Sequence, residues 1–368
     1  MSVIREQAQR NLFYVYTPRW IETSAGIKVL HQLCSLLNEI GQEAYLVFSE
    51  ESLNNSPRIN GELFTPILTK ELFLAHKLSH REPIVIYSET IVGNPLNAKY
   101  VIRYLLNYVE LLGGPSKFDC NTFFISYTKD IAHDYREKSF QESEVFFLPS
   151  IEVKKIPFNE KKEDFWLLYR GKINDYSVSK NYIDIKFLES TLNSKVEIVA
   201  RSGKKYIERR ELLDKLSKAK GVILFENSAI IMESLLSGGI AILLPSNLSR
   251  PIIGKEEFGL NGISLSLDLE EIERAESTKH LARSQYLALY ENTDERLINL
   301  ILKIEAFFSK MHPKDIGELR LPKNVKFING GRILLSFKIL RKNGLRAFLK
   351  LIISFMYRRL RFFLHQGK

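Results

Sequence analysis

Short apolar runs alternate with helix-length amphipathic segments along most of the chain. Residues 12–16 and 44–48 are apolar runs of strand length. Between them, apolar residues recur every three or four positions from Val29 to Ile40, and Gly41 follows, which predicts a helix ending there. A strand, a helix and a second strand with short joints form the unit of a parallel sheet. The chain therefore begins as a Rossmann-like domain begins.

The same alternation continues, and it divides into two series. The first series adds strands predicted over residues 83–87, 121–126 and 145–148, and a helix that starts at Asn94 and Pro95 and continues to Val109. The segment 149–163, with two prolines and many charges, reads as a linker. The second series has strands predicted at 165–169, 196–200, 222–225 and 240–244, with a helix over 210–219.

The pattern thus predicts an α/β protein with two Rossmann-like domains facing across a cleft, as a two-substrate enzyme requires. The expected boundaries are residues 1–155 for the first domain, 156–310 for the second, and 311–368 for a C-terminal extension.

The stretch from Gly221 to Pro245 contains the clearest such unit. Two apolar runs flank a helix-length segment, and two glycines follow that segment. Asn227 or Ser228 is suited to cap the helix, which would leave backbone N–H groups aimed into the crevice beyond the strand. A helix start of this kind attracts phosphate. Glu233 lies two turns into the helix.

Composition narrows the class of protein. Two cysteines, Cys34 and Cys120, in 368 residues fit a reducing compartment, and neither has a partner at metal-binding spacing. No HExxH, convincing DxD or other metal motif is present, so we expect no metal and no cofactor. The N-terminus lacks a signal-peptide core, and no run of 18 uncharged apolar residues occurs.

The net charge of +10 is unevenly placed. Residues 319–368 hold 13 Lys and Arg and no Asp or Glu, which leaves −3 for the rest of the chain. Within this tail, cations alternate with Leu, Ile and Phe at helical spacing. A basic amphipathic helix suits an anionic membrane surface. The alternatives are that it packs on the first domain or, given its charge, that it binds nucleic acid.

The segment from Gly221 to Pro245 also resembles the donor site of retaining GT-B glycosyltransferases. The nearest type is the family 4 enzymes of bacterial surface-polysaccharide synthesis, and the resemblance covers roughly residues 12–310. The resemblance rests on a pattern within this segment: a strand, a polar turn, a glutamate, a small residue and a glycine, followed by the next strand. The family usually has seven residues between two glutamates, whereas six separate Glu226 from Glu233 here.

The resemblance implies which residues bind and activate a nucleotide-sugar donor. Arg170 and Lys172, on either side of Gly171, would neutralise the diphosphate leaving group, and Glu226 would act with them in catalysis. The remaining residues implied in donor binding are Gly171, Lys180, Arg201, Asn227, Ser228, Ala229 and Glu233. A solvated basic turn at 170–172 and a solvated helix carboxylate at 233 are the structural alternatives.

The first domain supplies the acceptor side in this reading. Gly26 follows the first predicted strand, where a small-residue loop would approach the substrates. The string Tyr-Ser-Glu, then Gly-Asn-Pro-Leu, resembles a motif of bacterial polysaccharide glycosyltransferases and makes Glu89 and Asn94 acceptor-side candidates. Lys99, further along the same segment, is a third candidate for the cleft. The structural alternative is a capped helix with surface charges, and for Lys99 we favour that alternative.

The resemblance implies sugar transfer from a nucleotide sugar to a lipid-linked or cell-surface glycan, with retention and without metal. The tail would place the protein peripherally on the cytoplasmic face of the membrane, and no nucleic-acid partner is expected. Two other functions remain open from sequence. One is a nucleotide-sugar epimerase, which acts without an acceptor, and the other is a non-catalytic nucleotide-sugar-binding protein.

Overall fold

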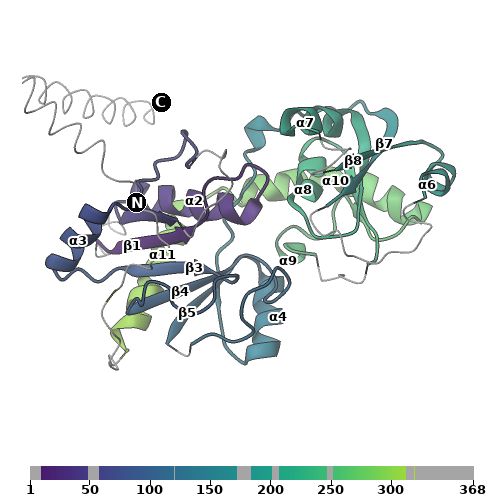
Figure 1. Cartoon of the computed structure of the whole chain (residues 1–368). Helices are drawn as coiled ribbons and strands as arrows, with labels where there is room; N and C mark the ends of the chain where they lie inside the picture. The colour runs from purple at the N-terminus through teal and green to yellow at the C-terminus, as the bar shows by residue number, and fades with distance from the viewer. Residues whose placement is uncertain are drawn as a thin grey trace, which may run out of the picture.

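The computed structural model describes residues 10–48, 58–119, 121–171, 184–200, 207–246, 252–311 and 319. Within these ranges the chain forms two parallel sheets, each flanked by helices (Figure 1). The expectation of two Rossmann-like domains facing across a cleft is confirmed. Cys120 and the basic tail lie outside the described residues, apart from Leu319, which is buried against the first domain.

The first domain is built on a parallel sheet with the strand order β2-β1-β3-β4-β5-β6. Its strands are β1 (Leu12–Thr17), β2 (Glu43–Phe48), β3 (Ile84–Ser88), β4 (Tyr100–Leu105), β5 (Thr122–Ser126) and β6 (Glu144–Val145). Its helices are α2 (Ala25–Glu39), α3 (Lys70–Leu78) and α4 (Lys129–Ser139). Helix α2 buries Val29, Leu33 and Leu37 along one face, and Gly41 takes the left-handed conformation after it.

The second domain repeats this arrangement with the order β11-β10-β9-β7-β8. Its strands are β7 (Glu163–Arg170), β8 (Lys195–Ala200), β9 (Ala219–Leu224), β10 (Ile240–Leu243) and β11 (Ile263–Ser264). Its helices are α6 (Ile185–Leu192), α7 (Arg209–Lys218), α8 (Ala229–Leu236), α9 (Lys255–Phe258) and α10 (Leu269–Ala288), and a single 3₁₀ turn, η1 (Val153–Lys155), precedes the domain.

Both sheets reverse their strand order at one point. In the first sheet the reversal lies between β1 and β3, and in the second it lies between β7 and β9. Loops that leave the carboxyl ends of these strands part to opposite faces and open a crevice between them. Each domain therefore has one place where its topology favours a ligand site.

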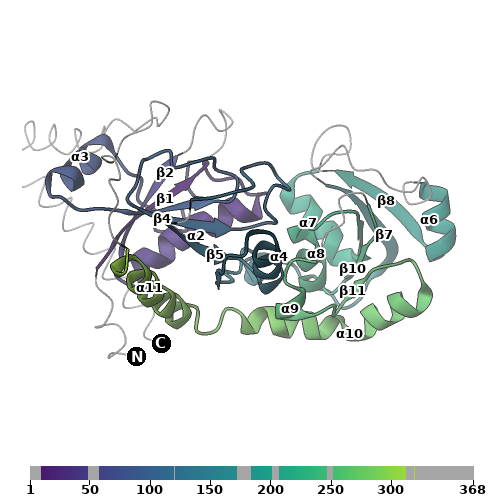
Figure 2. The same ribbon diagram turned by 90° about the horizontal axis from the view of Figure 1, so that it is seen from below.

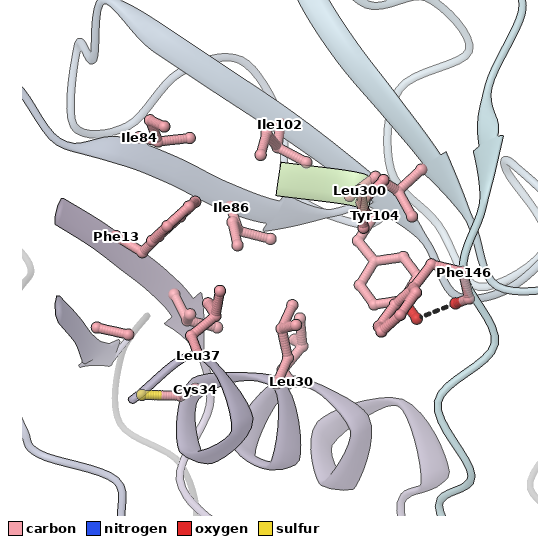
Figure 3. Close-up of a cluster of buried hydrophobic side chains, with 14 of the residues drawn as sticks. Phe13, Leu30, Cys34, Leu37, Ile84, Ile86, Ile102, Tyr104, Phe146 and Leu300 are labelled. Carbon is pink, nitrogen blue, oxygen red and sulfur yellow. Dashed lines mark hydrogen bonds between the residues drawn. The ribbon is translucent and has the colours of Figure 1, made fainter. Parts of the chain in front are cut away.

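The last described helix returns to the first domain. Helix α11 (Thr293–Ser309) follows α10 closely and packs Leu300, Ile301 and Ile304 into the core of the first sheet. Figure 2 shows α10 beneath the second domain and α11 beneath the first. In Figure 3, Leu300 lies beside Tyr104 of β4, whose hydroxyl donates a 2.5 Å hydrogen bond to the Phe146 carbonyl. The chain thus crosses between the two domains twice, once between β6 and β7 and once between α10 and α11.

One element differs in type from its prediction. The segment after Asn94 and Pro95 was expected to be a helix, but it contains a tight turn and then strand β4. Val101 and Leu105 satisfy helical spacing, yet the run YVIRYL is rich in β-branched and aromatic residues. Every residue of this strand after Tyr100 is buried between its neighbours β3 and β5, so long-range pairing decides the outcome.

Candidate functional site

The two switch points open onto one cavity of about 310 Å³ between the domains. The first domain contributes Gly26, in the first turn of α2 after β1, and Glu89, in the loop after β3. From the second domain it receives Asn227, Ser228 and Ala229, which lead from β9 into α8. The structure therefore brings five of the residues predicted from sequence to one place, because parallel strands end at the same sheet edge.

Most of the cavity wall is apolar. The hydrophobic and aromatic side chains on it come from both domains: Ile27, Leu30, Leu106, Leu112, Tyr127, Phe147, Ile151, Ile231, Met232, Ile252, Ile253, Phe258 and Tyr286. Polar groups are few, and Glu89 is the carboxylic acid among the described residues of the lining. Few polar groups on an apolar wall are typical of a small-molecule site.

Glu89 is held at the end of β3 with only 4% of its surface exposed. Its Oε2 accepts a 3.0 Å hydrogen bond from the Leu106 backbone N–H, which comes from the end of the neighbouring strand β4. Burial raises the pKa of Glu89 to about 7, against the smaller opposing effect of backbone N–H donors. A carboxylic acid poised near neutral pH is typical of proton-transfer sites.

Arg103 fixes the loop that carries Glu89. Its guanidinium donates to the carbonyls of Ser88 at 3.2 Å and Ile91 at 2.6 Å, and also to that of Gly93. The same group stacks against the rings of Tyr87 and Phe118, each centroid 5.0 Å away. Since Arg103 is 3% exposed, these bonds form in a water-poor interior, and they hold the backbone of the loop firmly.

A glycine closes the other side of this loop. A Cβ on Gly114 would lie 2.6 Å from the Glu89 carbonyl oxygen and 2.8 Å from the Thr90 Cα, and its φ of +98° is a conformation that favours glycine. The backbone at Glu89 is therefore enclosed on both sides.

The start of α8 forms the opposite side of the cavity. Ser228 occupies the N-cap position with extended backbone, as one of the two predicted caps, and its side chain makes no capping hydrogen bond. The first N–H groups of the helix are thus not capped by this residue. The Asn227 Oδ1 accepts from the Ile253 N–H at 3.2 Å, which joins this turn to the loop before α9.

Gly171 and Glu226 meet at the switch point of the second sheet. A Cβ on Gly171 would lie 2.0 Å from the Glu226 Oε1, so the carboxylate packs directly over the glycine backbone. Strands β7 and β9 are adjacent in the sheet, which is why the residues that follow them are neighbours. Arg170, the last residue of β7, is exposed and lies outside the cavity lining.

Glu233 is buried and forms an ion pair with Arg209, which is only partly buried. Its two carboxylate oxygens accept from the two terminal nitrogens of Arg209 at 2.5 and 2.6 Å. Burial acts to lower the pKa of Arg209, but the hydrogen bonds and charge of Glu233 outweigh it and raise that pKa. Lys28 of α2 is also buried, and burial lowers its pKa while the charge of Glu233 opposes this effect. The charge of Arg209 acts on Lys28 in the opposite direction to that of Glu233.

Other predicted site residues lie elsewhere. The Asn94 side chain binds the backbone of Ala98 and the hydroxyl of Tyr87, so it stabilises a turn and does not line the cavity. The ammonium of Lys99 sits over the Tyr100 ring, in line with the surface alternative. Lys172, Lys180 and Arg201 lie outside the described residues.

Three cations near the site were not among the predicted site residues. Lys28 lies two positions after Gly26, and Arg209 begins α7, so their proximity to sheet ends was a usable signal. Arg103 lies inside a strand, where no local pattern distinguishes it. Its contacts with the loop after β3 arise only because β4 pairs with β3 in the sheet.

A second contact between the domains lies behind the cavity. The Asp130 carboxylate at the start of α4 accepts from the Gly254 N–H at 3.0 Å, just before α9. In return, Glu257 of α9 accepts from the Lys129 N–H at 2.8 Å. Each helix start is capped by a carboxylate from the other domain, which favours this relative placement of the domains.

Two further features concern the described residues alone. No three or more His, Cys, Asp and Glu side chains there are grouped to hold a metal ion. No described helix is both long and apolar enough to cross a membrane.

No protein-family model matches the chain, and no curated protein matches it. Among solved structures, it is similar to WaaG, a glycosyltransferase involved in lipopolysaccharide biosynthesis, at 8% identity and a TM-score of 0.41, covering 79% of this chain and 99% of WaaG. It is also similar to SnogD, a glycosyltransferase from Streptomyces nogalater, at 12% identity and a TM-score of 0.43, covering 79% of this chain and 100% of SnogD. A UDP-forming α,α-trehalose-phosphate synthase from Burkholderia vietnamiensis has 9% identity and a TM-score of 0.46, covering 83% of this chain and 100% of its own. The activities named are those of these proteins, and at such identities none of their substrates follows for this chain.

Proposed function

We propose that this protein is a glycosyltransferase that moves a sugar from a nucleotide-sugar donor to a hydroxyl of a lipid-linked or cell-surface glycan. The observation that carries the proposal is the cavity shared by two facing switch points. Each parallel sheet offers a ligand crevice there, and one crevice for the donor and one for the acceptor suit a transfer between two substrates.

The second domain is suited to the donor. The α8 start offers backbone N–H groups to phosphate, next to Asn227, Ser228 and Ala229. Gly171 lacks a side chain, and this leaves room for the Glu226 carboxylate to pack on the chain just after β7. We assign Glu233, together with Lys180 and Arg201, to donor binding on the strength of the sequence resemblance.

The other residues assigned to the donor side would stabilise the charge that develops on the leaving group during transfer. As the anomeric C–O bond breaks, negative charge collects on the departing diphosphate, and cations placed beforehand lower the barrier. We assign this function to Arg170 and Lys172, and place Glu226 beside them because it packs on Gly171 between the two. In this proposal the reaction proceeds with retention and without a metal ion.

The proposal is tested with a panel of nucleotide sugars, namely UDP-glucose, UDP-galactose, UDP-N-acetylglucosamine and GDP-mannose. A donor present at 100 times its Kd stabilises the folded protein by about 2.7 kcal/mol, so the melting temperature should rise with at least one of them. No shift with any member would contradict the proposal. Conversion of the bound sugar to its epimer without an acceptor would favour the epimerase instead.

The metal-free assignment has its own test. EDTA should leave nucleoside diphosphate release unchanged, while replacing Arg170 and Lys172 together by alanine should lower it strongly. Loss of release in EDTA, with recovery on adding Mn²⁺ or Mg²⁺, would show that a metal ion stabilises the leaving group.

We further propose that residues 319–368 hold the protein on an anionic membrane surface on the cytoplasmic side. The 13 cations supply a salt-sensitive attraction of about 1 kcal/mol each near such a surface, and the interspersed Leu, Ile and Phe supply a salt-insensitive part. Deleting residues 344–368 should abolish sedimentation with phosphatidylglycerol liposomes and leave donor binding intact. Unfolding of the deletion variant would instead assign the segment to the protein's core.

A further inference from the structure

Glu89 combines features that a structural carboxylate does not need. It is buried, it borders the cavity, and it directly follows strand β3 at the switch point of the first domain. Burying a carboxylic acid without a cation costs free energy, and an amide or hydroxyl would accept the Leu106 N–H equally well. Arg103 and Gly114 nevertheless hold the loop so that the side chain keeps this position.

Burial, and not a neighbouring charge, is the main influence on the pKa of Glu89. The other ionisable side chains of the described lining are the phenols of Tyr127 and Tyr286, whose pKa values are raised by burial so that both stay neutral. The effects that act on the pKa of Glu89 are burial and backbone N–H donors, with no charged side chain among them. Arg103 of the neighbouring strand β4 is turned to the backbone carbonyls of Ser88, Ile91 and Gly93.

We propose that Glu89 accepts the proton of the attacking hydroxyl during sugar transfer, and that the acceptor therefore presents an uncharged hydroxyl to the apolar cavity. This inference rests on the proposed function. The acceptor side carries Glu89, and the donor side carries the α8 start, on the two walls of one cavity. A hydroxyl between them contacts the carboxylate on one side and the sugar on the other.

The step balances without another reactant. The hydroxyl oxygen forms the new bond to the anomeric carbon, and the bond from that carbon to the diphosphate oxygen breaks with its electron pair on the leaving group. The hydroxyl proton passes to Glu89 and leaves to solvent or to the diphosphate when products depart. This proton must be lost whichever face of the anomeric carbon is attacked, so the assignment holds for retention as for inversion.

The experiment uses the full-length protein, the nucleotide sugar that binds in the panel above, and water or octyl glucoside as the hydroxyl donor. Release of nucleoside diphosphate should rise with pH through about 7 in the wild type. Glu89→Gln should lower it at least 100-fold and remove the pH dependence, with the donor Kd changed less than twofold. Glu89→Asp should restore part of the rate, because it restores a carboxylate.

Glu257→Gln is the matched control. The pKa of Glu257 is also raised by burial, but the residue lies outside the cavity lining, and its amide would still accept from the Lys129 N–H. It should release diphosphate at the wild-type rate. The inference is overturned if Glu89→Gln keeps its rate, if it loses donor binding together with rate, or if a donor-bound wild type releases no diphosphate. Failure of every nucleotide sugar to bind the wild type would instead overturn the proposed function itself.

Discussion

Glu89 and Glu233 are both 4% exposed; Glu89 directly follows strand β3 of the first domain, and Glu233 lies within helix α8 of the second. Glu233 lies between the two terminal nitrogens of Arg209, so its charge is matched inside the protein. Glu89 faces an apolar cavity and accepts from one strand-end N–H. The two carboxyl groups are equally buried but differ in their surroundings. Glu233 in the second domain is held by a cation, whereas burial raises the pKa of Glu89 in the first domain to about 7.

The comparison shows what each domain contributes to the cavity. The ion pair between Glu233 and Arg209 holds α8 against α7. It thereby also fixes the backbone at the start of α8, which would face a donor phosphate. Glu89 of the first domain forms no ion pair with the described residues. Its carboxyl group would therefore be available to exchange a proton. The two domains share a strand order, and in our proposal Glu233 contributes to donor binding and Glu89 to proton transfer.

The largest expected effect is on the paired carboxylate. Glu233→Ala removes two hydrogen bonds between charged groups and leaves the partly buried Arg209 guanidinium without its partner, which should lower the free energy of unfolding by about 3–5 kcal/mol. Donor affinity should fall at least tenfold, the loss of about one charged hydrogen bond. Urea unfolding and calorimetric titration with the nucleotide sugar measure the two quantities.

A double-mutant cycle with Arg209→Ala checks the pairing. The two substitutions together should cost less than the sum of the single ones, because each alone leaves a charge uncompensated. Additive costs would show that the two side chains contribute independently, and unchanged donor affinity in a folded Glu233→Ala protein would remove this residue from the donor site.

A smaller effect of opposite sign is expected at the unpaired acid. The folded-state pKa of Glu89, about 7, lies above the ordinary value of 4.5, so the folded protein binds the proton more tightly than the unfolded chain. Stability from this group is present below pH 4.5 and is lost as pH rises through 7. Glu89→Gln should therefore be more stable than the wild type by on the order of 3 kcal/mol at pH 8.

Urea unfolding at several pH values measures this difference. Near pH 4 the two proteins should differ little, since the wild-type carboxyl is then protonated and resembles the amide. An advantage of the variant that stays constant from pH 4 to pH 8 would contradict the titration of Glu89 in this range. Greater stability combined with a lost transfer rate would identify a residue kept for function at a cost to the fold.

The smallest expected effect concerns the support of that acid. Arg103→Lys keeps the charge but cannot reach three carbonyls in one plane, so it should cost about 1–3 kcal/mol of stability. If the loop positions Glu89, diphosphate release should fall while donor affinity stays constant. Arg283→Lys is the matched control, since Arg283 likewise stacks on an aromatic ring and donates to a carbonyl, in the second domain. Equal rates for the two variants would limit Arg103 to a structural contribution.

Local patterns predicted most of the sheet strands and the sheet edge that carries the site. Strands such as β1, β9 and β10 are apolar runs bounded by polar or glycine-containing turns, and they lie within three residues of their predicted ends. Gly26, Glu89 and residues 227–229 were located because they follow such runs, and parallel strands all end at one edge. The helix expected after Pro95 failed because its apolar spacing fits both a helix and a buried strand.

What the sequence determined by itself is the succession of strands and helices, the asymmetry of charge between body and tail, and the residues at the strand ends. The tertiary structure decided which of these residues meet. Arg209 and Glu233 are 24 residues apart, and Leu106 and Glu89 are 17 apart, so no local pattern reports these contacts. It also decided that α11 completes the core of the first domain, far from it in sequence. Burial and charge pairing are properties of the packed molecule, and they distinguish Glu233, which is paired with a cation, from Glu89, whose pKa is raised by burial.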